Sequence, residues 1–309
     1  MSKQYFATSL ISDAHAVDIF AADTTPDLAI TCSGDSTVNF WSAVLPDHSL
    51  VKTLSTEHKL GIHHLCAHSE AGLLATSGFE GEVAVYSISD GTRLHRFSDS
   101  KSALWAIRFS PDGDFLAATT LDGRILVWNV SGETAEHCGT LEAKNSAGLC
   151  IDYSNDGLYI ATGHEDGGVY LFSTESARLV HSLLGNVHPV RTVAFSPLSK
   201  LLAVAGDSSI ITVYDVKSGE QVFNLAGHSR WVMSLDWNFT GEYIVSGSFD
   251  KSLKVWSIEK TECVATQNES DGPIWCVKWA KTAGSARPQG FIGVGADRSI
   301  RWYREAAGG

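Results

Sequence analysis

The chain has 309 residues, of which 44% are hydrophobic and 19% charged, and its formal net charge is −12 at pH 7. Proteins that bind DNA or RNA usually carry a basic patch, because contacts to phosphates drive their affinity, so we expect no direct nucleic-acid binding. No apolar run reaches the roughly 18 residues that a membrane-spanning helix needs, and the first residues lack the pattern of a secretory signal. We therefore expect no association with a membrane.

Six cysteines and twelve histidines are spread along the chain without the spacing of a metal site. There is no Cys-x-x-Cys pair, and the neighbours His63 and His64 would point to opposite faces of a strand. The sequence also lacks a phosphate-binding loop, a G-x-S-x-G motif and an H-E-x-x-H motif. We expect no metal, no cofactor and no enzymatic activity.

A repeat organises the whole chain. Seven short alternating stretches each end on an aromatic residue, at intervals of 42 to 47 residues: Trp41, Tyr86, Trp128, Phe172, Tyr214, Trp256 and Tyr303. A period of about 40–45 residues is typical of WD repeats, in which each repeat forms a propeller blade of four antiparallel strands. The period predicts an all-β fold, with a single seven-bladed WD-repeat β-propeller over residues 1–309.

The first predicted strand, KQYFATSL at 3–10, precedes the first repeat and has no neighbour in sequence to pair with. At the other end, only six residues follow Tyr303, which is too few for the outer strand of the last blade. We expect residues 1–14 to supply that strand and so close the ring. Closure matters because an open sheet edge invites aggregation.

A set of polar side chains recurs from repeat to repeat. The first repeat contains His15, Thr31, Asp35 and Trp41; the second contains His58, Thr76, Glu80 and Tyr86; the third keeps Asp122 and Trp128; and the sixth contains His228, Ser246, Asp250 and Trp256. A histidine beside a carboxylate and a hydroxyl resembles a catalytic group, but a catalytic group would occur once. We interpret the set as a structural tetrad whose buried hydrogen bonds stabilise each blade.

The sixth repeat predicts four strands most clearly, at 232–237, 242–248, 253–258 and 261–266. Turns such as Ser110–Gly113 and Ser154–Gly157 fall between the first and second strands of other repeats, as turn chemistry predicts. The longer connection at 281–290 is predicted to be a surface insertion.

The residues that lead into each inner strand should face one opening of the ring. In the sixth repeat they are Trp231 and Met233, and in the first we take Ala16 and Asp18 as their equivalents. Together with residues that precede the turn aspartates, they give eleven partner-binding candidates: Asp18, His63, Phe79, Trp105, Leu121, Leu149, Arg191, Trp231, Met233, Phe249 and Trp275.

This candidate set is unusually apolar for a surface. Some members could pack between blades instead, but the core positions of the repeats are already filled by Phe109, Phe195, Trp237 and Trp279. Exposed apolar patches usually mark partner sites, and tryptophan is frequent among hot-spot residues. We expect a short partner segment with an aromatic or aliphatic anchor and a basic flank, its charge selected by Asp18, Glu165 and Arg191.

Four segments carry a closer resemblance: AHAVDIF at 14–20, CSGD at 32–35, WVMSL at 231–235 and DRSIRWYREAAGG at 297–309. They resemble the WD-repeat subunit of the superkiller complex. The resemblance implies a non-catalytic scaffold that binds a tetratricopeptide-repeat protein and helps assemble it with an RNA helicase. It also implies that Trp105, Trp231, Met233, Phe249 and Trp275 lie on the partner face.

In that family the complex feeds messenger RNA into the cytoplasmic exosome for 3′-to-5′ decay. Fungal members are also associated with meiotic recombination, through a topoisomerase-like protein. The resemblance therefore implies a cytoplasmic protein with a second, nuclear role. The alternative is another WD-repeat adaptor, such as a reader of histone peptides or a substrate receptor of a ubiquitin ligase.

Overall fold

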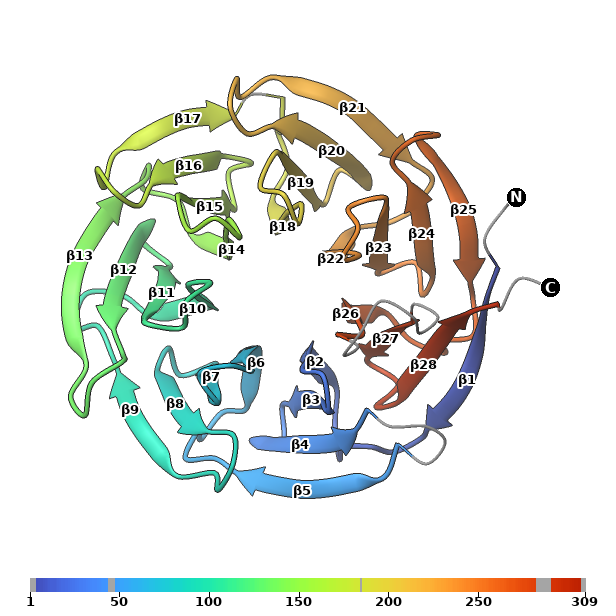
Figure 1. Cartoon of the computed structure of the whole chain (residues 1–309), viewed down its shortest axis with the longest axis horizontal. Coiled ribbons are helices and arrows are strands. Elements are labelled where there is room, and N and C mark those ends of the chain that lie inside the picture. Colours follow the sequence, from blue (N-terminus) through green and yellow to red (C-terminus); the bar gives the residue numbers. More distant parts are fainter. Residues whose placement is uncertain (1–3, 44–47, 184, 282–289, 307–309) are drawn as a thin grey trace.

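The computed structural model describes residues 4–43, 48–183, 185–281 and 290–306. Its regular secondary structure consists of strands, and no helix in these ranges could cross a membrane. Seven four-stranded antiparallel sheets stand around a common axis like the blades of a propeller (Figure 1). The predicted all-β, seven-bladed fold is confirmed.

Each blade contributes strands of four kinds. The inner strands, next to the axis, are β2 (Ile19–Thr24), β6 (Ile62–His68), β10 (Leu104–Phe109), β14 (Gly148–Tyr153), β18 (Val190–Phe195), β22 (Val232–Trp237) and β26 (Ile274–Trp279). The second strands are β3 (Leu28–Ser33), β7 (Leu73–Gly78), β11 (Phe115–Thr120), β15 (Tyr159–His164), β19 (Leu201–Gly206), β23 (Tyr243–Ser248) and β27 (Gly290–Gly295).

The third strands are β4 (Thr37–Ser42), β8 (Val83–Ser87), β12 (Arg124–Asn129), β16 (Val169–Ser173), β20 (Ile210–Asp215), β24 (Leu253–Ser257) and β28 (Ile300–Glu305). The outer strands are β5 (Leu50–Ser55), β9 (Arg93–Phe97), β13 (Glu136–Glu142), β17 (Leu179–Leu183), β21 (Gln221–Ala226), β25 (Glu262–Gln267) and, for the last blade, β1 (Tyr5–Ile11).

Burial explains why these segments form strands of different character. All six residues of β7 are buried, because neighbouring blades cover both of its faces. An outer strand such as β21 leaves most of its residues at least partly exposed on the rim. Side chains from adjacent blades share one core; for example, Phe40 of the first blade packs in a cluster with Ile62 and Leu74 of the second. The hydrophobic core is therefore a ring of blade interfaces.

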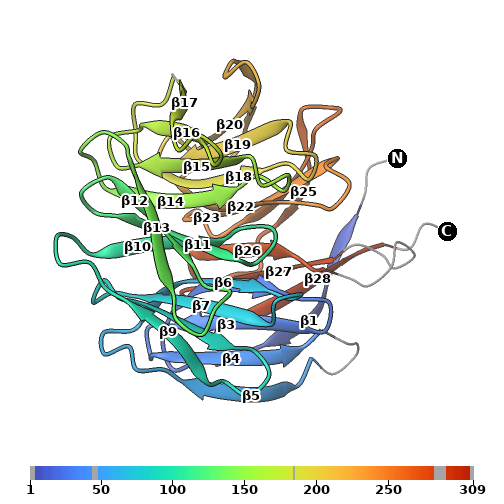
Figure 2. The same ribbon diagram turned by 60° about the vertical axis from the view of Figure 1, so that its left-hand side comes forward.

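The N-terminal strand closes the ring, as predicted. β1 pairs antiparallel with β28, from Tyr5 opposite Glu305 to Ile11 opposite Ile300, and both views place the two strands side by side (Figures 1 and 2). The buried ring of Tyr5 packs on Trp279 and Phe291, with centroid distances of 6.0 and 5.4 Å. The start of the chain is thus part of the core of the last blade.

The strands expected in the sixth repeat agree with β22 to β25 within one residue at each boundary. The predicted turns Ser110–Gly113 and Ser154–Gly157 join β10 to β11 and β14 to β15. The connection expected at 281–290 lies, apart from its two ends, outside the described residues.

Candidate functional site at the mouth of the central channel

A cavity of about 860 Å³ occupies the centre of the ring, and the inner strands of all seven blades line it. The loops that lead into the inner strands surround one mouth of this channel. The turns between first and second strands surround the other. The partner-binding candidates come from the first of these two ends.

A β-bulge in each inner strand directs one side chain into the channel. The pairing of β22 with β23 joins Val232 to Ser248 and then Ser234 to Gly247, which leaves Met233 out of register. The register shifts near the same point in the other six blades. A bulge re-aims a side chain, and the bulged residues all line the cavity: Phe20, His63, Trp105, Leu149, Arg191, Met233 and Trp275.

The equivalence predicted for the first blade was wrong, because Phe20 occupies the bulge and Asp18 does not. In the sixth blade, the residue two positions before the bulge accepts a backbone hydrogen bond, from Phe249 N–H to Trp231 O at 2.9 Å. In the first blade the same bond runs from Gly34 N–H to Asp18 O at 3.3 Å. Asp18 is therefore the counterpart of Trp231. The sequence signal for this register is the β-branched residue Ile19, which matches Val232 at the start of the inner strand; both side chains are fully buried.

Aromatic side chains form a continuous arc around this mouth. Centroid distances are 5.4 Å from Trp231 to Phe249, 5.8 Å from Phe249 to Trp275 and 6.0 Å from Trp275 to Phe20. The series continues at 5.3 Å from Phe20 to Phe79, 4.9 Å from Phe79 to His63 and 3.9 Å from His63 to Trp105. We call these seven residues, which span blades six, seven, one, two and three, the aromatic arc.

Two further properties of the arc concern a hydrogen bond to one of its rings and the charge of its histidine. The carboxylate of Asp18 accepts a hydrogen bond from the indole Nε1–H of Trp275 at 3.1 Å. Burial, together with the nearby His64 and His58, lowers the pKa of His63 to about 3. His63 is therefore neutral at pH 7 and contributes to the arc as an aromatic ring rather than as a charge.

The other predicted candidates lie near the arc without belonging to it. Arg191 is placed over the indole of Trp231, 4.7 Å from the ring centroid, and pairs with Asp207. Leu149 lines the cavity in blade four, where the arc is interrupted. Leu121 is exposed beside blade three, and its N–H donates to Ala103 O at 3.1 Å. Met233 lines the channel beneath Trp231.

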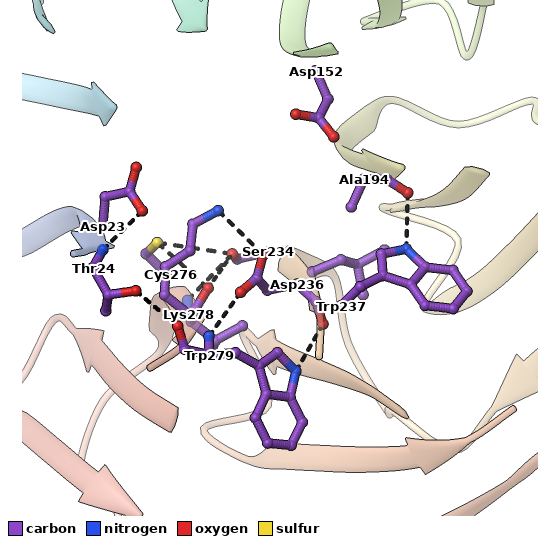
Figure 3. Close-up of polar contacts among 12 residues, drawn as sticks. Asp23, Thr24, Asp152, Ala194, Ser234, Asp236, Trp237, Cys276, Lys278 and Trp279 are labelled. Atoms are coloured by element: carbon purple, nitrogen blue, oxygen red, sulfur yellow. Dashed lines mark hydrogen bonds and ion pairs between the residues drawn. The ribbon is translucent and has the colours of Figure 1, made fainter. Parts of the chain in front are cut away.

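Deeper in the channel, three carboxylates bind the backbone of the next blade. Asp23 accepts from Ala67 N–H at 2.9 Å, Asp152 from Phe195 N–H at 2.8 Å and Asp236 from Trp279 N–H at 2.7 Å. Figure 3 shows the Asp236 contact, together with the bond from the indole of Trp279 to the carbonyl of Asp236. These carboxylates join blades one to two, four to five and six to seven.

Basic side chains neutralise the same carboxylates. Arg108 lies 2.8 Å from Asp152, Lys278 lies 3.5 Å from Asp236, and Lys281 lies 3.7 Å from Asp23. Burial alone would raise the pKa of Asp23, but Lys281, Lys278 and Arg108 together lower it to about 2. The charges of this ring are thus satisfied within the protein. Within the described ranges, no three histidine, cysteine or acidic side chains gather in a group that could hold a metal ion.

The four residues interpreted as a tetrad in blade six are joined by hydrogen bonds. The Nδ1 atom of His228 lies 2.8 Å from Asp250 Oδ2, and its Nε2 atom lies 2.7 Å from Ser246 Oγ. The indole of Trp256 donates to the same Ser246 oxygen at 2.8 Å. The network connects the leading loop to the second and third strands, away from the channel.

We expect Asp250→Ala to lower the free energy of unfolding by about 1–3 kcal/mol at pH 7, because it leaves buried donors without an acceptor. Burial alone would raise the pKa of Asp250, but hydrogen bonds from His228, Ser252 and Ser229 N–H hold it well below its usual range. A depressed carboxylate pKa stabilises the fold above the unfolded pKa of about 4 and stops doing so as the pH falls. Urea unfolding should therefore show the variant and the wild type converging at low pH. A constant difference between them would contradict this role.

In blade four, a histidine outside the predicted sets forms hydrogen bonds within the blade. His164, the last residue of β15, lies 3.0 Å from Thr162 Oγ1 and 2.8 Å from Ser146 O. It connects the second strand to the leading loop although no histidine leads into this blade. Its position after the second strand, rather than before the first, explains why the repeat pattern missed it.

The WD domain, G-beta repeat family matches four segments of the chain, 91–129, 136–173, 177–215 and 219–257, which together make up half of it. These segments correspond to parts of blades two to six. The family therefore agrees with the architecture described above.

Two curated relatives extend the similarity to essentially the whole chain, and a third covers 80% of it. Meiotic recombination protein rec14 of Schizosaccharomyces pombe is 41% identical over 309 residues, covering 99% of each chain. Antiviral protein SKI8 of Saccharomyces cerevisiae is 29% identical over 397 residues, covering 100% of each. WD repeat-containing protein SL1-17 of Schistosoma mansoni is 32% identical over 250 residues, covering 80% of each. The chain belongs to the WD-repeat family, and within it to the group that includes rec14 and SKI8.

Proposed function

We propose that this chain is a non-catalytic scaffold of a superkiller-type complex, with the aromatic arc as its partner-binding face. It would bind a short segment of a tetratricopeptide-repeat protein and help to assemble that protein with an RNA helicase, for decay of messenger RNA in the cytoplasm. The observation that carries the proposal is the arc itself, a series of seven rings joined by six contacts around one mouth of the channel.

The arc has the composition and exposure of a binding site rather than of a core. Trp231 is 43% exposed and Phe79 is 39% exposed, although both are in contact with other rings. Large rings held rigidly by one another lose little conformational freedom when a partner binds, and such residues dominate interface energetics. Leu121, Leu149 and Met233 would extend the apolar surface around the mouth.

The relatives support a role in a superkiller complex and a second role in meiotic recombination. The SKI8 protein matches over its full length, which favours a superkiller complex. The relative named for meiotic recombination matches at 41% identity, and this favours a second role in the nucleus through a topoisomerase-like partner. WD-repeat propellers are typically scaffolds rather than enzymes, and the net charge of −12 argues against direct binding of RNA.

Affinity purification of the tagged chain from its native cell, followed by mass spectrometry, tests the assignment. Recovery of a large tetratricopeptide-repeat protein together with an RNA helicase would support it. Recovery of histones or of a ubiquitin ligase without those two would favour the alternative WD-repeat adaptor.

We expect Trp231→Glu to weaken binding of the tetratricopeptide-repeat partner more than about tenfold, because a charge would replace the most exposed apolar anchor of the arc. The melting temperature should change little, since the side chain is half-exposed. Calorimetric titration of the purified pair would measure the loss. The matched control is Val222→Glu, at a position on the rim strand β21 that is 53% exposed. Equal binding by both variants would exclude the arc as the partner face.

A further inference from the structure

One end of the aromatic arc is covered by two guanidinium groups. Arg191 lies 4.7 Å from the centroid of Trp231, and Arg230 lies 5.7 Å from the centroid of Phe249. Cation–π contacts of this kind hold an arginine over a ring while leaving its N–H groups available. The two rings are themselves in contact, so both arginines border the same apolar surface.

The two arginines differ in what neutralises them. Arg191 is paired with Asp207, whose carboxylate receives both its Nε and one terminal nitrogen. Arg230 forms no ion pair and no side-chain hydrogen bond with any residue that the structure describes, although its carbonyl accepts from Ser248. Arg230 is thus a cation without an ion-pair partner among the described residues, and it lies beside the most exposed tryptophan of those residues.

Two acidic residues at the same end of the ring contact groups other than Arg230. The carboxylate of Asp250 is bonded to His228, Ser229 and Ser252 in the tetrad network. Asp271 lies beside Lys251, whose ammonium donates to the Asp271 backbone carbonyl at 2.8 Å. The described carboxylates of blade six that form ion pairs do so with His228, Lys260 and Lys278, and none of them pairs with Arg230.

We infer that the partner segment carries an aspartate or glutamate next to its apolar anchor, and that Arg230 binds this carboxylate. The anchor would lie on Trp231 and Phe249, and would exclude water from the ion pair that forms beside it. A charge pair gains strength when it is shielded from solvent in this way. The basic flank expected from Asp18 and Glu165 would lie farther along the mouth. The inference rests on the proposed function, because it names the chemistry of the same partner.

Charge variants of the full chain test the inference on the recovered tetratricopeptide-repeat partner. Arg230→Glu should weaken binding about tenfold or more, Arg230→Gln should weaken it less and flatten its salt dependence, and Arg230→Lys should keep most of the affinity. The control is Arg178→Glu, an exposed arginine in the turn between β16 and β17 at the opposite end of its blade. It should bind like the wild type.

Cross-linking identifies the partner group directly. In the Arg230→Lys variant, a water-soluble carbodiimide would join the new amine to an adjacent carboxylate as an amide. Mass spectrometry should locate that bond at an internal aspartate or glutamate beside an apolar residue, and the matched Arg178→Lys variant should not form it. A bond to the partner's C-terminal carboxylate, or none at all, would overturn the inference.

The outcomes also separate this inference from the proposed function. If Trp231→Glu abolishes binding while Arg230→Glu binds like the wild type, the arc remains the partner face and the carboxylate is excluded. If neither variant weakens binding, the arc is not the partner face and both ideas fail.

Discussion

Replacing Gly206 with alanine should lower the free energy of unfolding by about 3 kcal/mol or more, although it adds a single methyl group. Gly206 ends β19, and an added Cβ would overlap the carbonyl oxygen of Pro189 and lie 2.9 Å from the backbone nitrogen of Arg191. That carbonyl also accepts a hydrogen bond from Asp207 N–H at 3.0 Å. The backbone therefore cannot move aside without losing this bond.

The proline explains why the position requires glycine in this blade. In blade six, Ser248 takes the same place and its hydroxyl donates to Trp231 O at 2.9 Å, so a Cβ is accommodated there. In blade five the ring of Pro189 restricts the backbone that carries the carbonyl. Gly295 faces Pro273 in the same manner in blade seven.

A matched variant separates the steric effect from a general effect of adding a methyl group. Gly139 lies in the outer strand β13, and a Cβ there would meet no atom within 4 Å. We expect Gly139→Ala to change stability by less than about 0.5 kcal/mol. Chemical unfolding of the two variants measures both effects. A Gly206→Ala protein as stable as the wild type would mean that the leading loop of blade five can shift without cost.

Features that recur with the repeat could be predicted from the sequence. Period, blade number and ring closure depend on the spacing of residues such as Trp256 and Tyr303 and on the length of chain left at each end. The four strands of blade six followed from alternation and turn residues. Each of these signals is local, and each recurs.

Features that depend on the pairing of strands could not be predicted in full. The bulge that turns Met233 into the channel is a property of the register between β22 and β23, which the sequence does not state. Without it, the sequence aligns Asp18 with Met233 and does not single out Phe20. The contacts from Phe20 to Trp275 and Phe79 make the arc continuous at blade one.

The repeat pattern also did not predict the polar contacts of the blades that lack the complete tetrad. Blade three lacks a leading histidine, and Arg124 of its third strand pairs instead with Asp122 and with Asp99 of the leading loop. In blade five, Asn186 of the leading loop donates to the hydroxyl of Tyr214 at 3.1 Å. Different residue types thus form the link between leading loop and blade, because the geometry of the link is maintained and its chemistry is not.

Deleting residues 1–10 should destabilise the entire ring, by about 5 kcal/mol or more. The deletion removes the part of β1 that pairs with β28 from Glu305 to Arg301. It also removes the buried ring of Tyr5 from its contacts with Trp279 and Phe291, and the hydrogen bond from Gln267 to Tyr5 O at 2.6 Å. The exposed edge of β28 would then promote association between molecules.

Point variants show whether the stability of the ring depends on the buried side chains of β1 or only on the pairing of its backbone with β28. Tyr5→Ala should cost about 3–5 kcal/mol, because it leaves a cavity in the last blade. Phe6→Ala should cost less than about 0.5 kcal/mol, because that side chain is 50% exposed and points away from the core. Thermal unfolding, with light scattering to detect association, measures all three proteins. An unchanged melting temperature after the deletion would mean that β1 does not hold the ring closed. Loss of stability in the deletion and in Tyr5→Ala, with Phe6→Ala unaffected, would place the closing energy in the packing of Tyr5 against blade seven.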